Sequence, residues 1–268
     1  KIAIVAAAAI LLFGLTGMTA PVITLIAGAE KSFIGPKSAS GGENAEERTF
    51  RAEEFDRVEV RAEAMEIYVE QSSGDQASVK LITDKAIDNP FIFKSSIQSG
   101  VLRLSVDEKA RINFFDRVQN GERKLIVSLP KKQYDNLSIR NEFGSVDVTG
   151  VAAGQVEVRL DAGDIYVSGV SGKLTLESET GKIQAEGVTL DHDIFARTSV
   201  GDIDVRFSAP PKAGSIDARS RIGNVSVDAA GLLYSVYSEN RVAGRFASAG
   251  PKLEAVTEIG SITVGTAP

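Results

Sequence analysis

Residues 156–167 read VEVRLDAGDIYV, and this stretch decides the fold. Apolar residues alternate with polar ones on both sides of Gly163, which is the pattern of two short strands joined by a tight bend. The same pattern recurs as LSIRNEFGSVDV at 137–148, LTLESETGKIQA at 174–185, IFARTSVGDIDV at 194–205, IDARSRIGNVSV at 216–227 and LEAVTEIGSITV at 253–264.

A glycine occupies the eighth position of every one of these copies. The predicted turn glycines are Gly144, Gly163, Gly181, Gly201, Gly223 and Gly260. A seventh copy begins at Leu233 and carries Asn240 at that position, and asparagine tolerates positive φ better than most residues. A degenerate eighth copy begins at Val58 and carries Met65 there. We therefore expect Asn240 to form a turn of the same kind.

The repeats predict an all-β fold. The copies recur at intervals of about 17 to 22 residues, and strands this short cannot bury their apolar faces alone. Stacking the copies gives them one continuous core. We expect a single-stranded β-solenoid of about seven or eight coils, taken as right-handed, in which each coil pairs with the next along the chain.

The alternation also assigns faces to the side chains. Leu137, Ile139, Val146 and Val148 are expected to point inward, as are their counterparts in the later copies. Outward residues then stack as ladders. One ladder contains Arg140, Arg159, Glu177, Arg197 and Arg219, and another contains Asp164, Lys182 and Asp202. Opposite charges on neighbouring strands stabilise strand pairing, so we interpret both ladders as solvated faces that hold the register.

The N-terminus predicts export from the cytoplasm. Residues 2–29 contain no charge and are long enough to span a bilayer as a helix. An uncleaved transmembrane anchor over residues 1–31 fits this length. A cleaved signal peptide is the alternative, because Ala27, Gly28 and Ala29 supply a small-x-small cleavage site. Both interpretations place the remainder in the cell envelope, as a membrane-anchored extracytoplasmic domain or as a secreted or periplasmic one.

The remaining boundaries follow from composition. Residues 32–49 are rich in Gly, Ser, Lys and Glu and are predicted to be a flexible linker. The solenoid domain covers residues 50–268, with irregular cap layers over 50–135 and regular repeats over 136–265. The cap region contains Phe91, Phe93, Phe114 and Phe115. Burial in a cap that shields the first coil is one interpretation of these aromatics, and an exposed surface that binds a partner is the other.

Composition excludes several classes of function. The formal net charge is −6 without a basic block, which argues against binding of nucleic acid, since that needs clustered Lys and Arg to neutralise phosphates. The chain has no cysteine, so structural disulfides and thiolate metal sites are impossible. Residues 171–173 (SGK) have a faint likeness to a phosphate-binding loop but lack its other required residues, so we expect no nucleotide site.

No catalytic, metal or cofactor site is predicted. His192 is the only histidine and has no partner ligands of the kind that a metal site requires. Asp161 and Asp164 flank a turn but lack the nine-residue pattern of calcium-binding repeats. Asp164, Asp202 and Asp204 could serve a polysaccharide-active enzyme, although Lys182 between the first two favours an ion-pair ladder.

The sequence resembles the bacterial "putative adhesin" family of unknown function, DUF4097. The resemblance rests on FDRVEV at 55–60, LPKKQYDNLSI at 129–139, and the repeats GDIYVSGV at 163–170 and GKIQAEGV at 181–188. It implies a β-helix outside the membrane, and some similar proteins are associated with cell-envelope stress operons. It implies no functional residues.

Three hypotheses for function follow. The first is a non-catalytic, membrane-anchored interaction scaffold or envelope sensor that binds an envelope or membrane protein. The second is an adhesin that binds a polysaccharide or a cell surface. The third is a polysaccharide-active enzyme.

Overall fold

The computed structural model describes residues 43–84, 91–108 and 123–267, which form two sheets. Sheet A has the order β1 (Glu43–Arg51), β4 (Gln76–Asp84), β7 (Arg123–Pro130), β3 (Glu66–Ser72), β9 (Val146–Thr149), β11 (Ile165–Ser168), β13 (Ile183–Val188), β15 (Ile203–Phe207), β21 (Ile262–Thr266), β17 (Val225–Val227). Sheet B has the order β18 (Leu233–Tyr237), β19 (Arg241–Arg245), β16 (Ala213–Ile222), β20 (Ser248–Ile259), β14 (Ile194–Val200), β12 (Ser171–Thr180), β10 (Ala152–Ala162), β8 (Gln133–Phe143), β2 (Arg57–Ala64), β6 (Val101–Glu108), β5 (Phe91–Gln98). One 3-10 turn, η1, spans Ala52–Glu54.

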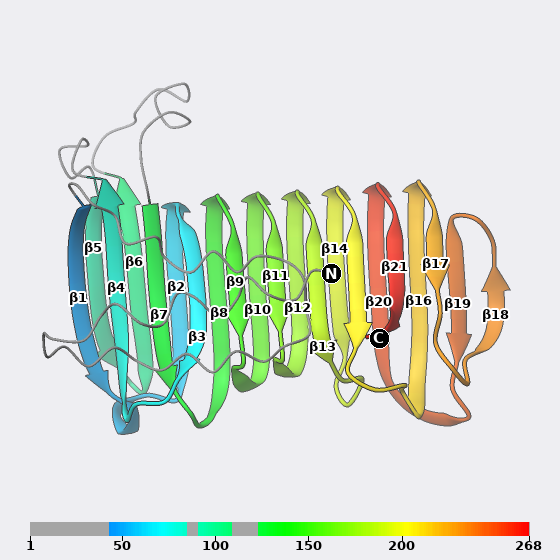
Figure 1. Ribbon diagram of the computed structural model, residues 1–268, viewed down its shortest axis with the longest axis horizontal. Helices are drawn as coiled ribbons and strands as arrows, with labels where there is room; N and C mark the ends of the chain where they lie inside the picture. The colour runs from blue at the N-terminus through cyan, green and yellow to red at the C-terminus, as the bar shows by residue number, and fades with distance from the viewer. Residues whose placement is uncertain (1–42, 85–90, 109–122, 268) are drawn as a thin grey trace, which may run out of the picture. The chain divides into compact units, whose positions relative to one another are not determined.

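Each repeat forms one coil, with its first strand in sheet B and its second in sheet A (Figure 1). Neighbouring coils pair in parallel and in register, so that Val156 lies between Leu137 and Leu174. The all-β, solenoid-like architecture predicted from the repeats is therefore confirmed.

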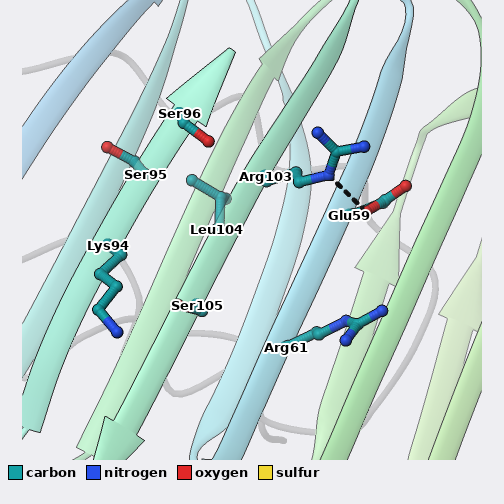
Figure 2. Close-up of a pocket in the computed structure, with 8 residues that line it drawn as sticks. All are labelled: Glu59, Arg61, Lys94, Ser95, Ser96, Arg103, Leu104 and Ser105. Carbon is teal, nitrogen blue, oxygen red and sulfur yellow. Dashed lines mark hydrogen bonds and ion pairs between the residues drawn. The ribbon is translucent and has the colours of Figure 1, made fainter. Parts of the chain in front are cut away.

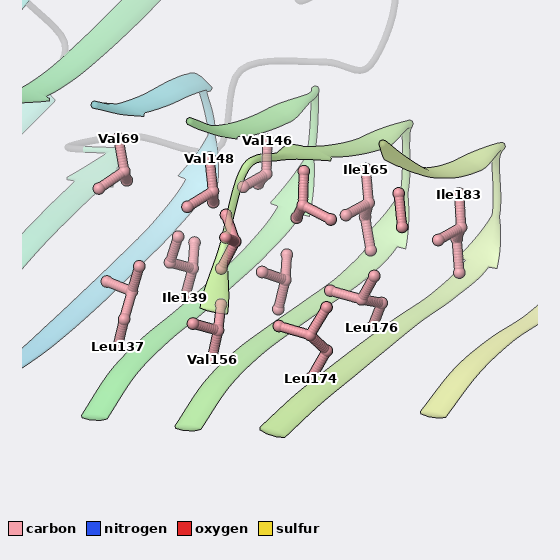
Figure 3. Close-up of a cluster of buried hydrophobic side chains, with 14 of the residues drawn as sticks. Val69, Leu137, Ile139, Val146, Val148, Val156, Ile165, Leu174, Leu176 and Ile183 are labelled. Carbon is pink, nitrogen blue, oxygen red and sulfur yellow. The ribbon is translucent and has the colours of Figure 1, made fainter. Parts of the chain in front are cut away.

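The core lies between the two sheets. Inward residues such as Ile139, Val158 and Ile165 are at most 1% exposed, as the alternation predicts. Figure 3 shows these side chains from both sheets meeting in one continuous apolar layer. Burying each such side chain contributes about 1.5–3 kcal/mol, which makes this layer the main source of stability.

The six repeat glycines lie at the turn between the two strands of a coil, and all have positive φ. The short distance between glycines of neighbouring coils is as important as their φ. A Cβ on Gly163 would lie 1.6 Å from the carbonyl oxygen of Gly144, and a Cβ on Gly181 would lie 2.0 Å from that of Gly163. The coils therefore stack so closely at this corner that no side chain fits.

A buried polar residue stands three positions before most of these glycines. Ser178, Thr198, Ser220 and Thr257 each donate a side-chain hydrogen bond of 2.7–3.0 Å to a glycine carbonyl of the neighbouring coil. Asn141 donates likewise to the carbonyl of Met65. The five side chains are at most 4% exposed, so these bonds satisfy carbonyls that water does not reach.

The coils are not stacked in chain order at the C-terminal end. Strands β20 and β21, the last in the chain, lie between β14/β15 and β16/β17 (Figure 1, red). The glycine column shows the same order, because Gly260 stacks on Gly201 and Gly223 stacks on Gly260. The prediction that each coil pairs with the next along the chain is wrong here.

A similar insertion occurs at the N-terminal end. The degenerate copy from Val58 forms β2 and β3, with Met65 at the turn. This coil lies between β8/β9 and the later strands β6 and β7. Strands β1, β4 and β5 then close this end with antiparallel pairs. The predicted cap region 50–135 thus contributes a parallel coil as well as closing strands.

The copy from Leu233 is not a coil. Strands β18 and β19 form an antiparallel hairpin at the end of sheet B, and Asn240 lies in its turn without positive φ. The carbonyl of Asn240 accepts a hydrogen bond from the Ser220 N–H, and that of Glu239 accepts one from Val225. The prediction that Asn240 forms a turn of the same kind as the repeat glycines is wrong, because the chain reverses there to form a hairpin that caps the last coil.

The predicted linker also needs correction at its end. Residues 43–49 belong to β1, which pairs along its whole length with β4. The alternation of polar and apolar residues there is weak, so composition alone suggested a linker. The rest of the linker and the apolar segment 1–31 lie outside the described residues. Among the residues that the structure describes, no helix has the length and hydropathy of a membrane span.

Candidate functional site

The outer face of sheet B carries a straight row of cations, which we call the central row. Strand register places its members side by side in the order Lys94, Ser105, Arg61, Arg140, Arg159, Glu177, Arg197, Val256, Arg219 and Arg241. Seven of the ten are Lys or Arg. Neighbouring members are one strand spacing apart, about 4.8 Å.

The predicted ladder on this face is correct in its middle. Glu177 lies between Arg159 and Arg197, as expected. Arg219 does not neighbour Arg197, because the inserted strand β20 places Val256 between them. Arg61 and Lys94 extend the row at the other end, and the repeats do not predict this because the strands of these two residues lie outside the regular repeats.

Most cations of the central row are neutralised by carboxylates. Arg159 Nε lies 2.8 Å from Glu157 and 3.1 Å from Glu177. Arg219 pairs with Glu254 at 2.8 Å, and Arg241 pairs with Asp217 at 3.3 Å. These pairs are partly exposed, so each contributes about 0.2–1 kcal/mol and mainly fixes side-chain positions.

Arg61 and Arg197 have no ion pair or hydrogen bond within the part of the chain that the structure describes. Arg61 is also next to a like charge, since its register neighbour on β8 is Arg140. Arg140 itself reaches only Glu157, at 3.8 Å. Like charges on adjacent strands destabilise a sheet, and Arg61 has no ion pair of its own to offset the charge of Arg140.

A groove of about 490 Å³ lies at this end of the row, and we call it the Arg61 groove. Its charged lining residues are Arg61, Lys94, Arg103 and Glu59 (Figure 2). The hollow follows from side-chain size, because the short Ser105 stands in the central row between the long Lys94 and Arg61. The lining carries three positive charges and one negative charge.

The carboxylates beside Arg61 on β2 are already engaged. Glu59 accepts a hydrogen bond of 3.1 Å from Arg103 Nε, which Figure 2 shows as a dashed line. Glu63 accepts one of 3.3 Å from the backbone N–H of Glu108. The Arg61 guanidinium is therefore left exposed with its donors available to a ligand.

A second groove of about 440 Å³ adjoins the first and shares Arg61. Arg140 and Arg159 line it together with the acidic side chains Glu63, Asp107, Glu142 and Asp161. Its lining therefore has an excess of negative charge, in contrast to the Arg61 groove. The positive excess is therefore confined to the lining of the Arg61 groove, on the strands β5, β6 and β2.

Two of the four candidate phenylalanines are buried. Phe91 and Phe93 are 4% and 8% exposed and point inward from β5, so they do not form an exposed interaction surface. The Arg48 guanidinium lies 4.3 Å from the Phe93 ring centroid and donates to the Phe93 carbonyl at 3.0 Å, which closes the end of the core. Phe114 and Phe115 lie outside the described residues.

The aspartates considered for catalysis have structural contacts. Asp164 accepts a hydrogen bond from the Lys182 N–H, and Asp202 accepts one from the Ser261 N–H, both at 2.7 Å. Lys182 Nζ donates to Gln184 instead of pairing with either aspartate, so the predicted ion-pair ladder is wrong. His192 is exposed in a loop. Among the described residues, no group of three or more potential metal-ligating side chains is clustered.

The outer face of sheet A carries two partly buried groups whose pKa is raised. Burial raises the pKa of Asp147 above its ordinary value, opposed by a hydrogen bond from Thr149, while nearby Glu70 adds to the increase. Burial also raises the pKa of Tyr166, whose hydroxyl donates to Glu186 at 3.0 Å.

The two motifs of the family resemblance meet in space. Lys132 Nζ donates to Asp56 at 2.8 Å and also to the carbonyls of Ala52 and Phe55. Tyr134 packs 6.2 Å from Phe55 and donates to the Pro130 carbonyl at 2.9 Å. Burial, with a smaller effect of Asp56, raises the pKa of Tyr134 to about 12. These motifs therefore fix the start of β2 against β8.

The stacked coils, the glycine corner and the two long outer faces define a β-solenoid that displays surfaces. The family model described as Toastrack DUF4097 matches residues 133–265, and the chain belongs to this family. The resemblance inferred from the sequence is thereby confirmed.

Solved structures of similar proteins cover 84–85% of this chain. A "putative cell adhesion protein" from Clostridium sporogenes is 10% identical, with a TM-score of 0.47, covering 84% of this chain and 100% of that one. A "putative adhesin" from Bacteroides fragilis is 15% identical, with a TM-score of 0.41, covering 84% and 97%. Another from Parabacteroides merdae is 12% identical, with a TM-score of 0.29, covering 85% and 97%. The comparison with curated proteins gives no match.

Proposed function

We propose that this protein is a non-catalytic scaffold of the cell envelope that recognises a partner with the outer face of sheet B. The central row is the observation that carries this proposal. It places Lys and Arg side chains at one strand spacing over most of the sheet, on a rigid core that holds them in fixed positions. Such a surface suits repeated contacts with an extended or multivalent partner.

The apolar residues 2–29 support the location. As an uncleaved helix they would anchor the protein in a membrane and place the solenoid outside the cytoplasm. In this arrangement the solenoid acts by display, as an interaction scaffold or as the sensing part of an envelope-stress system. The partner is an envelope protein or a surface polymer.

Adhesion to a surface polysaccharide is the second candidate function. The Arg61 groove favours it, because an open groove with excess positive charge suits an acidic polymer better than an apolar protein surface.

A photo-crosslinking residue at two positions of one coil tests the scaffold proposal. Thr175 on β12 and Gln184 on β13 are both partly exposed and lie on opposite outer faces, so the second is a matched control. In the full-length protein in its native membranes, we expect a crosslink to an envelope component from position 175 and none from position 184. Equal crosslinking from both positions, or none from either, contradicts recognition by sheet B.

A further inference from the structure

We infer that the Arg61 groove binds an oxyanion, carboxylate or phosphate, carried by a surface polysaccharide. This inference rests on the proposed function, because it names the class of partner that the face of sheet B recognises. It starts from the one lining residue that the fold leaves without a counter-ion. Arg61 faces Arg140 on one side, and both of its carboxylate neighbours on β2 accept hydrogen bonds from other donors.

The geometry of the groove suits an oxyanion. Lys94 and Arg61 are separated in the central row by Ser105, so their strands are two spacings, or about 9.6 Å, apart. An anionic group that lies over Ser105 would lie between Arg61, which has no ion pair, and Lys94, which pairs with Asp107 at 3.4 Å. Arg103, in the adjoining row, adds a third positive charge on the same side, although Glu59 already holds its Nε.

The guanidinium of Arg61 sets the class of ligand. Its planar donors match two oxygens of a carboxylate or a phosphate, and such charge-assisted pairs are stronger than neutral hydrogen bonds. An anion there also relieves the repulsion between Arg61 and Arg140.

A polymer fits better than a small ion. The Arg61 groove is open and adjoins the second groove through Arg61 itself. Although the lining of the second groove has an excess of negative charge, a chain with widely spaced acidic groups can place its next one at Arg140, whose only ion pair among the described residues is 3.8 Å long. The single sites of such a surface are weak, and repeated acidic groups on one chain raise the overall affinity by avidity. Binding through exposed charges should weaken as ionic strength rises, since salt screens these interactions.

The test uses full-length protein in a neutral detergent and three polymers. Polygalacturonate supplies carboxylates, inorganic polyphosphate supplies phosphates, and dextran of similar length is the neutral control. We expect binding of at least one acidic polymer by isothermal calorimetry and none of dextran. Arg61→Ala should weaken that binding about tenfold, which is the usual effect of losing a charge-assisted pair.

Lys173→Ala is the control variant. Lys173 on β12 is also an exposed cation of sheet B without an ion pair among the described residues, but it lies outside the central row and both grooves. It should change affinity less than twofold, roughly the scale of a screened distant charge. Ser105→Leu fills the hollow without changing charge and should also weaken binding. Thermal unfolding of each variant excludes loss of fold as the cause.

The outcomes separate this inference from the proposed function. Preference for polygalacturonate or for polyphosphate identifies the oxyanion. Equal affinity for the two polymers shows that the groove recognises negative charge without distinguishing carboxylate from phosphate. Failure of both acidic polymers to bind, or equal losses in Arg61→Ala and Lys173→Ala, overturns the inference. A crosslink from position 175 would then still support the scaffold, with a protein partner. Failure of the crosslinking as well would refute both proposals.

Discussion

Replacing Gly181 with alanine should destabilise the protein by about 3–5 kcal/mol, which is exceptional for the addition of one methyl group. Gly181 has a φ of +147°, where a Cβ is strained. The added Cβ would also lie 2.0 Å from the carbonyl oxygen of Gly163 on the neighbouring coil. Backbone atoms cannot rotate away as a flexible side chain can, so the two coils must separate.

The separation would break more than one contact. The Gly181 carbonyl accepts the buried hydrogen bond from Thr198, and its N–H donates to Val200. Urea denaturation of the purified protein measures the loss. Gly74→Ala is the control, because a Cβ there has only one neighbour, 4.0 Å away, and should change stability by less than about 0.5 kcal/mol. Similar denaturation midpoints for the two variants would contradict close stacking at the glycine corner.

Removing residues 248–268 should unfold a region that lies before them in the sequence. These residues form β20 and β21, which lie between β14/β15 and β16/β17. Their removal deletes the buried side chains Leu253 and Ile262 and exposes the apolar faces of the coils on both sides. Each large apolar side chain lost from the core contributes about 1.5–3 kcal/mol, so β16–β19 would have too little left to stay folded against β14.

Hydrogen exchange gives a clear measurement of this effect. We expect residues 213–245 to lose amide protection in the shortened chain, whereas β8–β13 keep theirs. A chain that ends at residue 267 serves as the control. If the coils were stacked in chain order, the deletion would remove only an outermost layer. Retained protection over residues 213–227 would therefore argue against the inserted coil.

Local pattern was sufficient to predict the coil but not the order of coils. Alternation around Gly144 and Gly163 specifies two strands and a corner, because the period of two and the need for positive φ are local properties. Which coil lies beside which depends on long-range pairing between nearly equivalent repeats. The sequence from Leu253 pairs equally well by pattern with any neighbour, and only the fold shows that it lies between β14 and β16.

The hairpin shows the limit of reading a repeat by its spacing. The copy from Leu233 matches the apolar positions, but β18 is exposed along its length and pairs antiparallel with β19. One signal was available in the sequence. Where the other late copies have Thr198, Ser220 and Thr257 three positions before the glycine, this copy has Tyr237.

The candidate site was only partly predictable. Arg140, Arg159 and Arg197 could be aligned from the repeats, whereas Arg61 and Lys94 could not, because β2 pairs with the non-sequential strands β6 and β8, and β5 joins the row only through β6. Arg61 has no ion pair because Glu59 and Glu63 contact other donors, and no sequence pattern specifies these side-chain contacts.

The insertion of β2 between β6 and β8 creates the Arg61 groove, so it is the feature to test most directly. The chain has no cysteine, and pairs of cysteines can be introduced without competing thiols. Glu59 is the register neighbour of both Ser138 and Arg103. A disulfide should therefore form readily in the Glu59→Cys/Ser138→Cys variant under mild oxidation. It should not form in Arg103→Cys/Ser138→Cys, whose strands are about 9.6 Å apart, beyond the reach of a disulfide. The reverse result, with Cys pairing only between positions 103 and 138, would place β6 beside β8 and contradict both the coil order and the groove.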